Sequence, residues 1–431
     1  MLYYQNLSGT NYIKNCYLGM PTVRFLHFSD LHIGVENYGR PDPETGLSTR
    51  LGDFLDSLDE VVDCAINENV DLVLLAGDAY KGRDPSQTHQ REFAKRLSTL
   101  SNAGVPTFIL VGNHDLPNAV SRATAVEIFR TLQVPNLYIG DTLQNYLVPT
   151  PSGPIQILAV PWPRRGGLLS RDESRGLTIE EIRQELENRL TIAIQDRLSQ
   201  LNPDIPAILT GHLTVNGATV GTERSMMLGQ DHILLASTLH QPQLEYVALG
   251  HIHKHQILRD EPPMIVYSGS LQRVDFTEEL DEKGFCLIDL DPNAPRGNRL
   301  VNFEFRKTQA RPFVTININI KAEDPDPTNT AVTEIGKKDI DGAIVRVRIS
   351  IPSELESHLR ESEIRVALDQ AHYIAAINKE TEDTRRIRID NASAEGLQPG
   401  QALRLYVQGK DFTDARQEKL INYGDALINT E

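Results

Sequence analysis

Short apolar runs recur through the first three hundred residues, and helical spacing fills several of the gaps between them. The runs that we interpret as strands are 22–30, 70–78, 106–115, 155–161, 205–212, 244–253 and 285–291. Helical spacing is found at 53–69, 87–103, 121–132 and 178–201. The last of these begins with Thr178 and Glu181, which match a capping box. This alternation predicts an α/β fold with helices packed on mostly parallel or mixed sheet.

The pattern changes after residue 300. Segments that alternate apolar and polar residues, as half-solvated strands do, lie at 300–307, 312–320, 343–351 and 385–391. We predict a helix around 354–370 and a polar loop at 321–332. Residues 305–395 are therefore interpreted as a small α+β domain that follows a larger domain at 20–300. A terminal segment at 400–431 is predicted to be helical from residue 411 on.

Composition places the chain among ordinary globular proteins. It has 431 residues, of which 40% are hydrophobic and 24% charged, which is enough for two or three domains. Its three cysteines are widely spaced and form no metal-binding pair, which favours a cytoplasmic protein. Residues 1–19 lack the features of a signal peptide, and Met20 stands directly before the first strand, so we interpret them as a disordered or mis-assigned leader.

The net charge of −16 argues against a protein that holds nucleic acid by bulk electrostatics alone. It leaves room for a local basic groove, or for DNA contacts that are shared with a partner. A site built from carboxylates and imidazoles would also bind cations that offset part of this charge.

Candidate metal ligands follow five of the predicted strands. Residues two apart on a strand share one face, so Asp30 and His32 point the same way at the end of 22–30. The full set of potential ligands is Asp30, His32, Asp78, Asn113, His212, His251 and His253. Seven ligands of this type fit two divalent metal ions that share a bridging residue. Glycines before several of them let the backbone turn sharply and approach the ions.

The ordered motifs SDLHIG, AGD, GNHD, TGH and GHIH resemble those of the calcineurin-like metallophosphoesterase superfamily. Within it, RFLHFSDLHIG, the GNHD form, YSGSLQRVDF at 267–276 and the trailing α+β domain are most similar to the SbcD family. Those proteins are the nuclease subunits of bacterial SbcCD complexes, which have counterparts among double-strand-break repair nucleases. The resemblance implies a four-layered αββα catalytic domain with a smaller capping domain.

The resemblance also implies roles for single residues. One metal ion, most simply Mn²⁺, would be held by Asp30, His32, Asp78 and His253. The second would be held by Asp78, Asn113, His212 and His251, with Asp78 as the bridge. His114 is implied to be catalytic, lying over the phosphate without binding metal, and Asp115 is expected to orient its neighbours.

The activity that the resemblance implies is metal-dependent cleavage of DNA. Members of the family act as double-strand 3′–5′ exonucleases and as endonucleases on hairpins and single strands, in DNA repair and recombination. They work with an SMC-like coiled-coil ATPase of the SbcC type and form homodimers. We therefore expect residues 400–431 to dock on such a partner, although a helix that packs on its own domain is the alternative.

Three further residues lie outside the ligand set. Archaeal relatives often carry histidine three positions after the bridging aspartate, where this chain has Lys81, which we interpret as a cation that positions substrate. Arg273 is predicted to contact DNA phosphate or, equally, to brace a loop. His27 faces away from Asp30 on its strand, so we expect a packed histidine and no ligand.

Two other functions compete with that of a DNA nuclease. A small-molecule phosphomonoesterase or a cyclic-nucleotide phosphodiesterase can use the same core, but it does not need the 131 residues after residue 300. A non-catalytic scaffold has no use for a complete ligand set. Each ligand alone would be explained by strand-end capping, whereas all seven in order favour a metal site.

Overall fold

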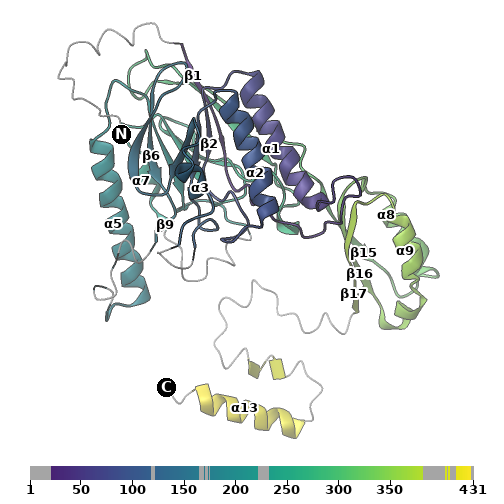
Figure 1. Cartoon of the computed structure of the whole chain (residues 1–431). Helices are drawn as coiled ribbons and strands as arrows, with labels where there is room; N and C mark the ends of the chain where they lie inside the picture. Colours follow the sequence, from purple (N-terminus) through teal and green to yellow (C-terminus); the bar gives the residue numbers. More distant parts are fainter. Residues whose placement is uncertain are drawn as a thin grey trace, which may run out of the picture. The chain divides into compact units, whose positions relative to one another are not determined.

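The computed structural model describes residues 21–117, 122–164, 169, 173, 175–221, 233–381, 403–404, 406–407 and 414–428 (Figure 1). The chain divides into two compact units, Met1–Arg311 and Pro312–Glu431. The predicted leader at 1–19 and the predicted strand at 385–391 lie outside the described residues.

The first unit contains a six-stranded sheet built around β1 (Val23–Phe28). The strand order is β14-β13-β1-β2-β3-β4, and β1 to β4 run parallel. The other bounds are β2 (Leu72–Leu75), β3 (Thr107–Leu110), β4 (Leu137–Gly140), β13 (Gly284–Leu290) and β14 (Leu300–Lys307). Strands β13 and β14 continue the sheet in antiparallel fashion. The predicted strand at 300–307 therefore exists, but it belongs to the first unit.

A second six-stranded sheet has the order β11-β12-β10-β7-β6-β5. Its strands are β5 (Gln144–Val148), β6 (Ile155–Val160), β7 (Ala207–His212), β10 (Tyr246–Gly250), β11 (Gln256–Arg259) and β12 (Met264–Tyr267). The central strands pair in parallel, and β5 and β11 are antiparallel edges. A small parallel pair, β8 (Thr214–Val215) and β9 (Ile233–Leu234), lies beside a short helix, α7 (Ala236–Leu239).

Three hydrophobic clusters separate four layers. Residues such as Leu55 and Phe93 of the helices α1 (Thr49–Asn67) and α2 (Gln87–Asn102) pack on the first sheet. Residues such as Phe108 and Ile208 fill the space between the two sheets. Leu190 and its neighbours on α5 (Ile179–Ser199) cover the second sheet. The four-layered αββα prediction is thus confirmed, with α1 and α2 on one outer face and α5 on the other (Figure 1).

The ends of the helices follow local chemistry. The Thr178 hydroxyl accepts a hydrogen bond from the backbone of Glu181, and the Glu181 carboxylate accepts one from the backbone of Thr178. This confirms the capping box that was predicted for 178–201. Of the helical pattern predicted at 121–132, the described part, 122–132, contains only the short α3 (Glu127–Thr131). No helix among the described residues combines the length and the apolar character that a membrane crossing requires.

The second unit is a parallel three-stranded sheet of β15 (Phe313–Asn319), β16 (Ile344–Ile351) and β17 (Tyr373–Thr381). Its core includes Ile316, Val347 and Ile364. The polar loop that was predicted at 321–332 is wrong, because α8 (Pro327–Ile335) begins there with Asp326 as its N-cap and proline in its first turn. The predicted helix at 354–370 is divided into a 3-10 turn, η2 (Ser353–His358), and α9 (Glu361–Ala367). The terminal helix is present as α13 (Asp414–Ile428).

His27 lies on β1 and is fully buried. Its Nδ1 atom is 3.1 Å from the hydroxyl of Tyr246, across the space between the sheets, and the two rings meet edge to face. Burial lowers the pKa of His27 to about 3, so the folded protein keeps this imidazole neutral. His27 is therefore a packed core histidine.

His27 should make the first unit acid-sensitive. The unfolded chain takes up a proton near pH 6.5, whereas folded His27 does not until about pH 3, so stability is present above pH 6.5 and is lost as the pH falls. Between pH 7 and pH 5 this residue should cost the folded state about 2 kcal/mol. We expect His27→Gln to lose correspondingly less stability than wild type over that interval, measured by urea unfolding in EDTA. Equal losses in the two proteins would contradict this assignment.

Candidate metal centre

The predicted ligands lie at the ends of strands of both sheets or in the loops that follow them. The loop after β1 carries Asp30 and His32, and the loop after β2 carries Asp78. Backbone hydrogen bonds join these two loops, from Asp30 N to Gly77 O at 3.1 Å and from His32 N to Asp78 O at 3.0 Å. Strands β3, β7 and β10 deliver the remaining ligands at the same end of the first unit. Parallel strands commonly place their functional loops at this edge.

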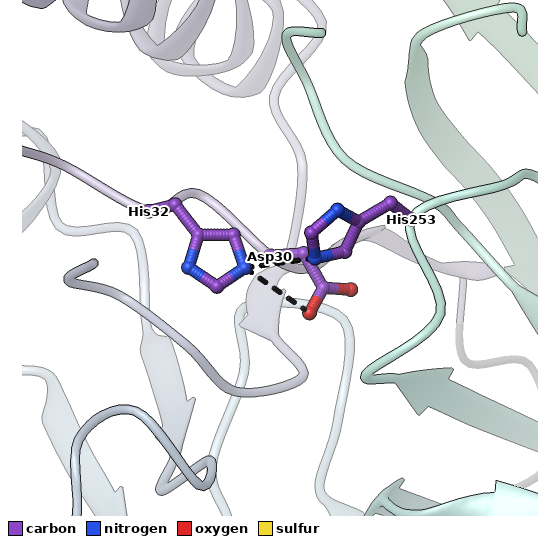
Figure 2. Close-up of side chains that lie close together, drawn as sticks. All are labelled: Asp30, His32 and His253. Atoms are coloured by element: carbon purple, nitrogen blue, oxygen red, sulfur yellow. Dashed lines mark hydrogen bonds and ion pairs between the residues drawn. The ribbon is translucent and has the colours of Figure 1, made fainter. Parts of the chain in front are cut away.

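A first cluster consists of Asp30, His32 and His253 (Figure 2). The Nε2 atoms of the two histidines are 2.9 Å apart, and His32 Nε2 is 3.9 Å from the Asp30 carboxylate. All three residues are less than 10% exposed. Their side chains converge from the loop after β1 and the loop after β10, two strands that belong to different sheets.

A second cluster consists of Asp78, Asn113, His212 and His251. His212 Nε2 is 3.2 Å from the Asp78 carboxylate and 2.9 Å from the Asn113 amide oxygen. His251 Nδ1 is 3.2 Å from that same oxygen. Asp78 also lies 3.7 Å from His32 of the first cluster, so its carboxylate stands between the two. All seven residues that the sequence nominated are brought together.

Several of these residues have strained backbones. Asp30, His32, Asp78 and His251 have φ angles of 52°, 47°, 55° and 92°, in the left-handed region that side chains other than glycine disfavour. Such strain persists only where the surrounding structure enforces it, and it concentrates at functional sites. The strain indicates that the fold is built to aim these side chains.

The donor groups suit divalent metal ions. Carboxylate and amide oxygens combined with imidazole nitrogens are ligands of Mn²⁺ and similar cations. The loops are packed closely around them: a β-carbon on Gly112 would stand 2.1 Å from Oδ1 of Asp78. The residues present therefore fit two metal ions that share Asp78.

The electrostatics agree with a cation-binding site. Burial, with the neighbouring His253, lowers the pKa of His32 well below its ordinary value, which leaves a neutral imidazole with a free electron pair. Burial alone would raise the pKa of Asp78, but the surrounding histidines, His212 first, hold it below the usual range. Burial raises the pKa of Asp30. A bound cation would favour the charged form of both carboxylates.

His114 lies beside both clusters: its backbone N–H donates to Oδ1 of Asp78 at 2.9 Å, and its ring lies close enough to His32 and Asp78 for the three side chains to hold an ion together. Its Nδ1 is 2.7 Å from the carbonyl oxygen of Lys81, and its ring meets that of His32 edge to face at 4.9 Å. The bond to the carbonyl requires a proton on Nδ1, so Nε2 is the nitrogen that can meet a substrate. Lys81 thus orients His114 through its backbone, while its own side chain is exposed.

Asp115 ties two of the ligand loops together. Its buried carboxylate accepts hydrogen bonds from the backbone of Gly112 at 3.0 Å, Tyr80 at 3.3 Å and Ala79 at 3.4 Å. Burial and the nearby Asp78 raise its pKa to about 6. This placement matches the supporting position that the sequence suggested for it.

Arg273 braces a loop. Its guanidinium donates to the carbonyl oxygens of Glu279, Asp281, Ala310 and Arg311 at 2.9–3.3 Å. These bonds occupy all three of its nitrogens, so the geometry favours the bracing interpretation over a contact with DNA phosphate.

Two residues of the site were not predicted from the sequence. Glu278, on the short turn η1 (Phe276–Glu278), is 2.7 Å from Nδ1 of His253, and only its closeness to the YSGSLQRVDF segment hinted at a role. Trp162, the single tryptophan, follows β6 and lies against the rings of His251 and His212 at 4.9 Å and 6.2 Å. Neither residue belongs to a periodic pattern or to a ligand motif.

Comparison with known proteins places this geometry in a family. Residues 23–255 match the family model described as calcineurin-like phosphoesterase. The chain is 27% identical over 274 residues to the SbcD component of the nuclease SbcCD from Bacillus subtilis, with 63% of this chain and 67% of that protein covered. For the SbcD protein of Rhodobacter capsulatus the identity is 30% over 290 residues, with 62% and 66% covered.

A third relative is the DNA double-strand break repair protein Mre11 of Aeropyrum pernix, 25% identical over 306 residues, with 70% of this chain and 64% of that protein covered. The matched region thus spans about two thirds of the length of these curated relatives. The family model covers more than half of the chain and includes every candidate metal ligand. This chain therefore belongs to the calcineurin-like phosphoesterases, as its motifs predicted.

Proposed function

We propose that this protein is a two-metal phosphodiesterase that cleaves DNA. The observation that carries the proposal is the convergence of six other donor residues, five of them buried, around the carboxylate of Asp78, with His114 beside them. The similarity to proteins named as components of the nuclease SbcCD and as Mre11 favours DNA over other phosphoesters.

Asp78 and His114 have separate roles in the proposed reaction. Two divalent cations bound at such a site neutralise the charge of a phosphoryl group and activate water for attack on it. Asp78 fixes the spacing of the two ligand clusters, because its carboxylate reaches both. His114, held by the Lys81 carbonyl, presents Nε2 to stabilise the developing charge or to protonate the leaving oxygen.

The finer points of the proposal follow from the relatives. We propose Mn²⁺ as the metal, DNA ends and hairpins as substrates, and an SMC-like ATPase of the SbcC type as the partner. Residues 400–431 remain our candidate for docking on that partner, and homodimerisation remains a prediction. Because the chain carries a net charge of −16, contacts from a partner would help to hold a polyanionic substrate.

The first prediction from this proposal concerns His114 and Asp78. With Mn²⁺ and a hairpin-ended duplex, His114→Gln should lower kcat by about 10²–10⁴-fold, the usual contribution of a general acid, and still bind two ions per chain. Asp78→Asn should lose cleavage and most metal binding, because it weakens both clusters. Cleavage is followed on gels and metal binding by calorimetry.

His240→Ala is the matched control, because it removes an exposed imidazole that belongs to no ligand motif, and it should cleave like wild type. Wild-type protein that binds two ions but spares DNA would be tested again with the ATPase partner. If DNA is still not cleaved in the presence of the partner but a nitrophenyl phosphoester is hydrolysed, the small-phosphoester alternative would replace the DNA proposal.

The second prediction concerns Lys81. Since its carbonyl oxygen orients His114 and its side chain is exposed, Lys81→Met should leave kcat within a few-fold of wild type. We expect KM for DNA to rise and its dependence on salt to become shallower by about one counterion. Steady-state cleavage at several salt concentrations measures both. A large fall in kcat with unchanged KM would assign the side chain a direct part in the chemistry.

A further inference from the structure

A buried ion pair lies behind the first ligand cluster. Glu278 and Lys283 are each only 2% exposed, and Glu278 Oε2 is 2.8 Å from Lys283 Nζ. The other carboxylate oxygen, Oε1, is 2.7 Å from Nδ1 of His253. The three residues therefore form a continuous chain from a buried ammonium group, through a carboxylate, to a candidate metal ligand.

The polar atoms of this pair are all engaged. Lys283 Nζ also donates to the carbonyl oxygen of His253 at 3.0 Å and to the hydroxyl of Ser270 at 2.9 Å. Glu278 Oε2 also accepts a hydrogen bond from the backbone of Val274 at 2.9 Å. Lys283 thus holds both the backbone of His253 and the carboxylate that contacts its ring.

A buried ion pair is costly to desolvate, and apolar side chains of similar volume often serve stability equally well. Stability alone therefore does not explain this pair. Its contact with His253 offers a reason. An ionised carboxylate only accepts hydrogen bonds, so Nδ1 of His253 must carry the ring proton. Nε2 then keeps its electron pair, and this is the atom 2.9 Å from Nε2 of His32.

The second cluster is oriented differently. Nδ1 of His212 bonds to the carbonyl oxygen of Ala76 at 2.8 Å, a neutral acceptor. A carboxylate makes the imidazole behind it a more basic ligand than a carbonyl does. The two clusters therefore differ in the charge of the group that stands behind a ligand histidine.

We propose that Glu278, held by Lys283, is a positioning residue that fixes the ring and the protonated nitrogen of His253 and so strengthens metal binding at the first cluster alone. This inference rests on the metal centre of the proposed function. It assigns the two ions unequal dependence on Glu278, which a purely structural role of the pair would not produce.

The test is calorimetric titration of metal-free, full-length protein with Mn²⁺, with Trp162 fluorescence recorded in parallel. Trp162 contacts His251 and His212, so its signal reports the second cluster. In Glu278→Gln, Mn²⁺ binding at the second cluster, which Trp162 reports, should keep its Kd. Mn²⁺ binding at the first cluster should weaken by about 10–100-fold.

Because Glu278→Gln leaves Lys283 without its counter-charge, Glu278→Gln/Lys283→Met is the second variant. It removes both charges, keeps a neutral acceptor for His253, and should show the same selective weakening. Glu282→Gln is the matched control, since its exposed carboxylate pairs with Lys307 at the surface and should not alter either event.

Wild-type Kd values for both ions in the two test variants would overturn the proposal. Equal weakening of Mn²⁺ binding at both clusters would overturn it as well. The readout is independent of DNA. A protein that binds two ions with the expected selectivity but cleaves no DNA, either alone or with the ATPase partner, would contradict the proposed function and still support the role of Glu278.

Discussion

The site depends on how closely the ends of the two sheets approach each other. A β-carbon on Gly77, which follows the first sheet's β2, would stand 2.1 Å from the imidazole of His212 on the second sheet. A β-carbon on Gly250, at the end of β10, would stand 2.1 Å from the carbonyl oxygen of Ala76. No side chain fits at either place, so only glycine lets ligands from both sheets reach one small volume.

This close approach also explains the strained backbones of the ligand loops. The apolar clusters between and outside the sheets fix where each strand ends, and the loops must then turn within one or two residues to aim Asp30, Asp78 and His251 inward. Strain of about 1–3 kcal/mol per residue is tolerable because the packed layers over-determine the positions of the strand ends. The core therefore supports the geometry of the site as well as the stability of the fold.

What the sequence could predict follows from where the information lies. The ligands come directly after short apolar runs, so the strand pattern located them and the motifs supplied their identity. Glu278 has no such marker: it reaches His253 only because the chain folds back between β12 and β13. Helix α8 was missed since its segment is rich in polar residues, although Asp326 and Pro327 form a recognisable helix start. The edge strands β4, β5 and β11 and the strand β17 are too short or too weakly alternating to stand out.

The chemistry of the centre is set by groups that the motifs do not contain. The motif residues provide the donors, but their protonation is decided by what stands behind them, a carboxylate for His253 and backbone carbonyls for His212 and His114. The carbonyls are available to any sequence that adopts this backbone. The carboxylate must be provided by a particular side chain, and burying it requires Lys283 as well. Differences in metal affinity among proteins with the same motifs can therefore arise from the loop before β13, without any change in a ligand.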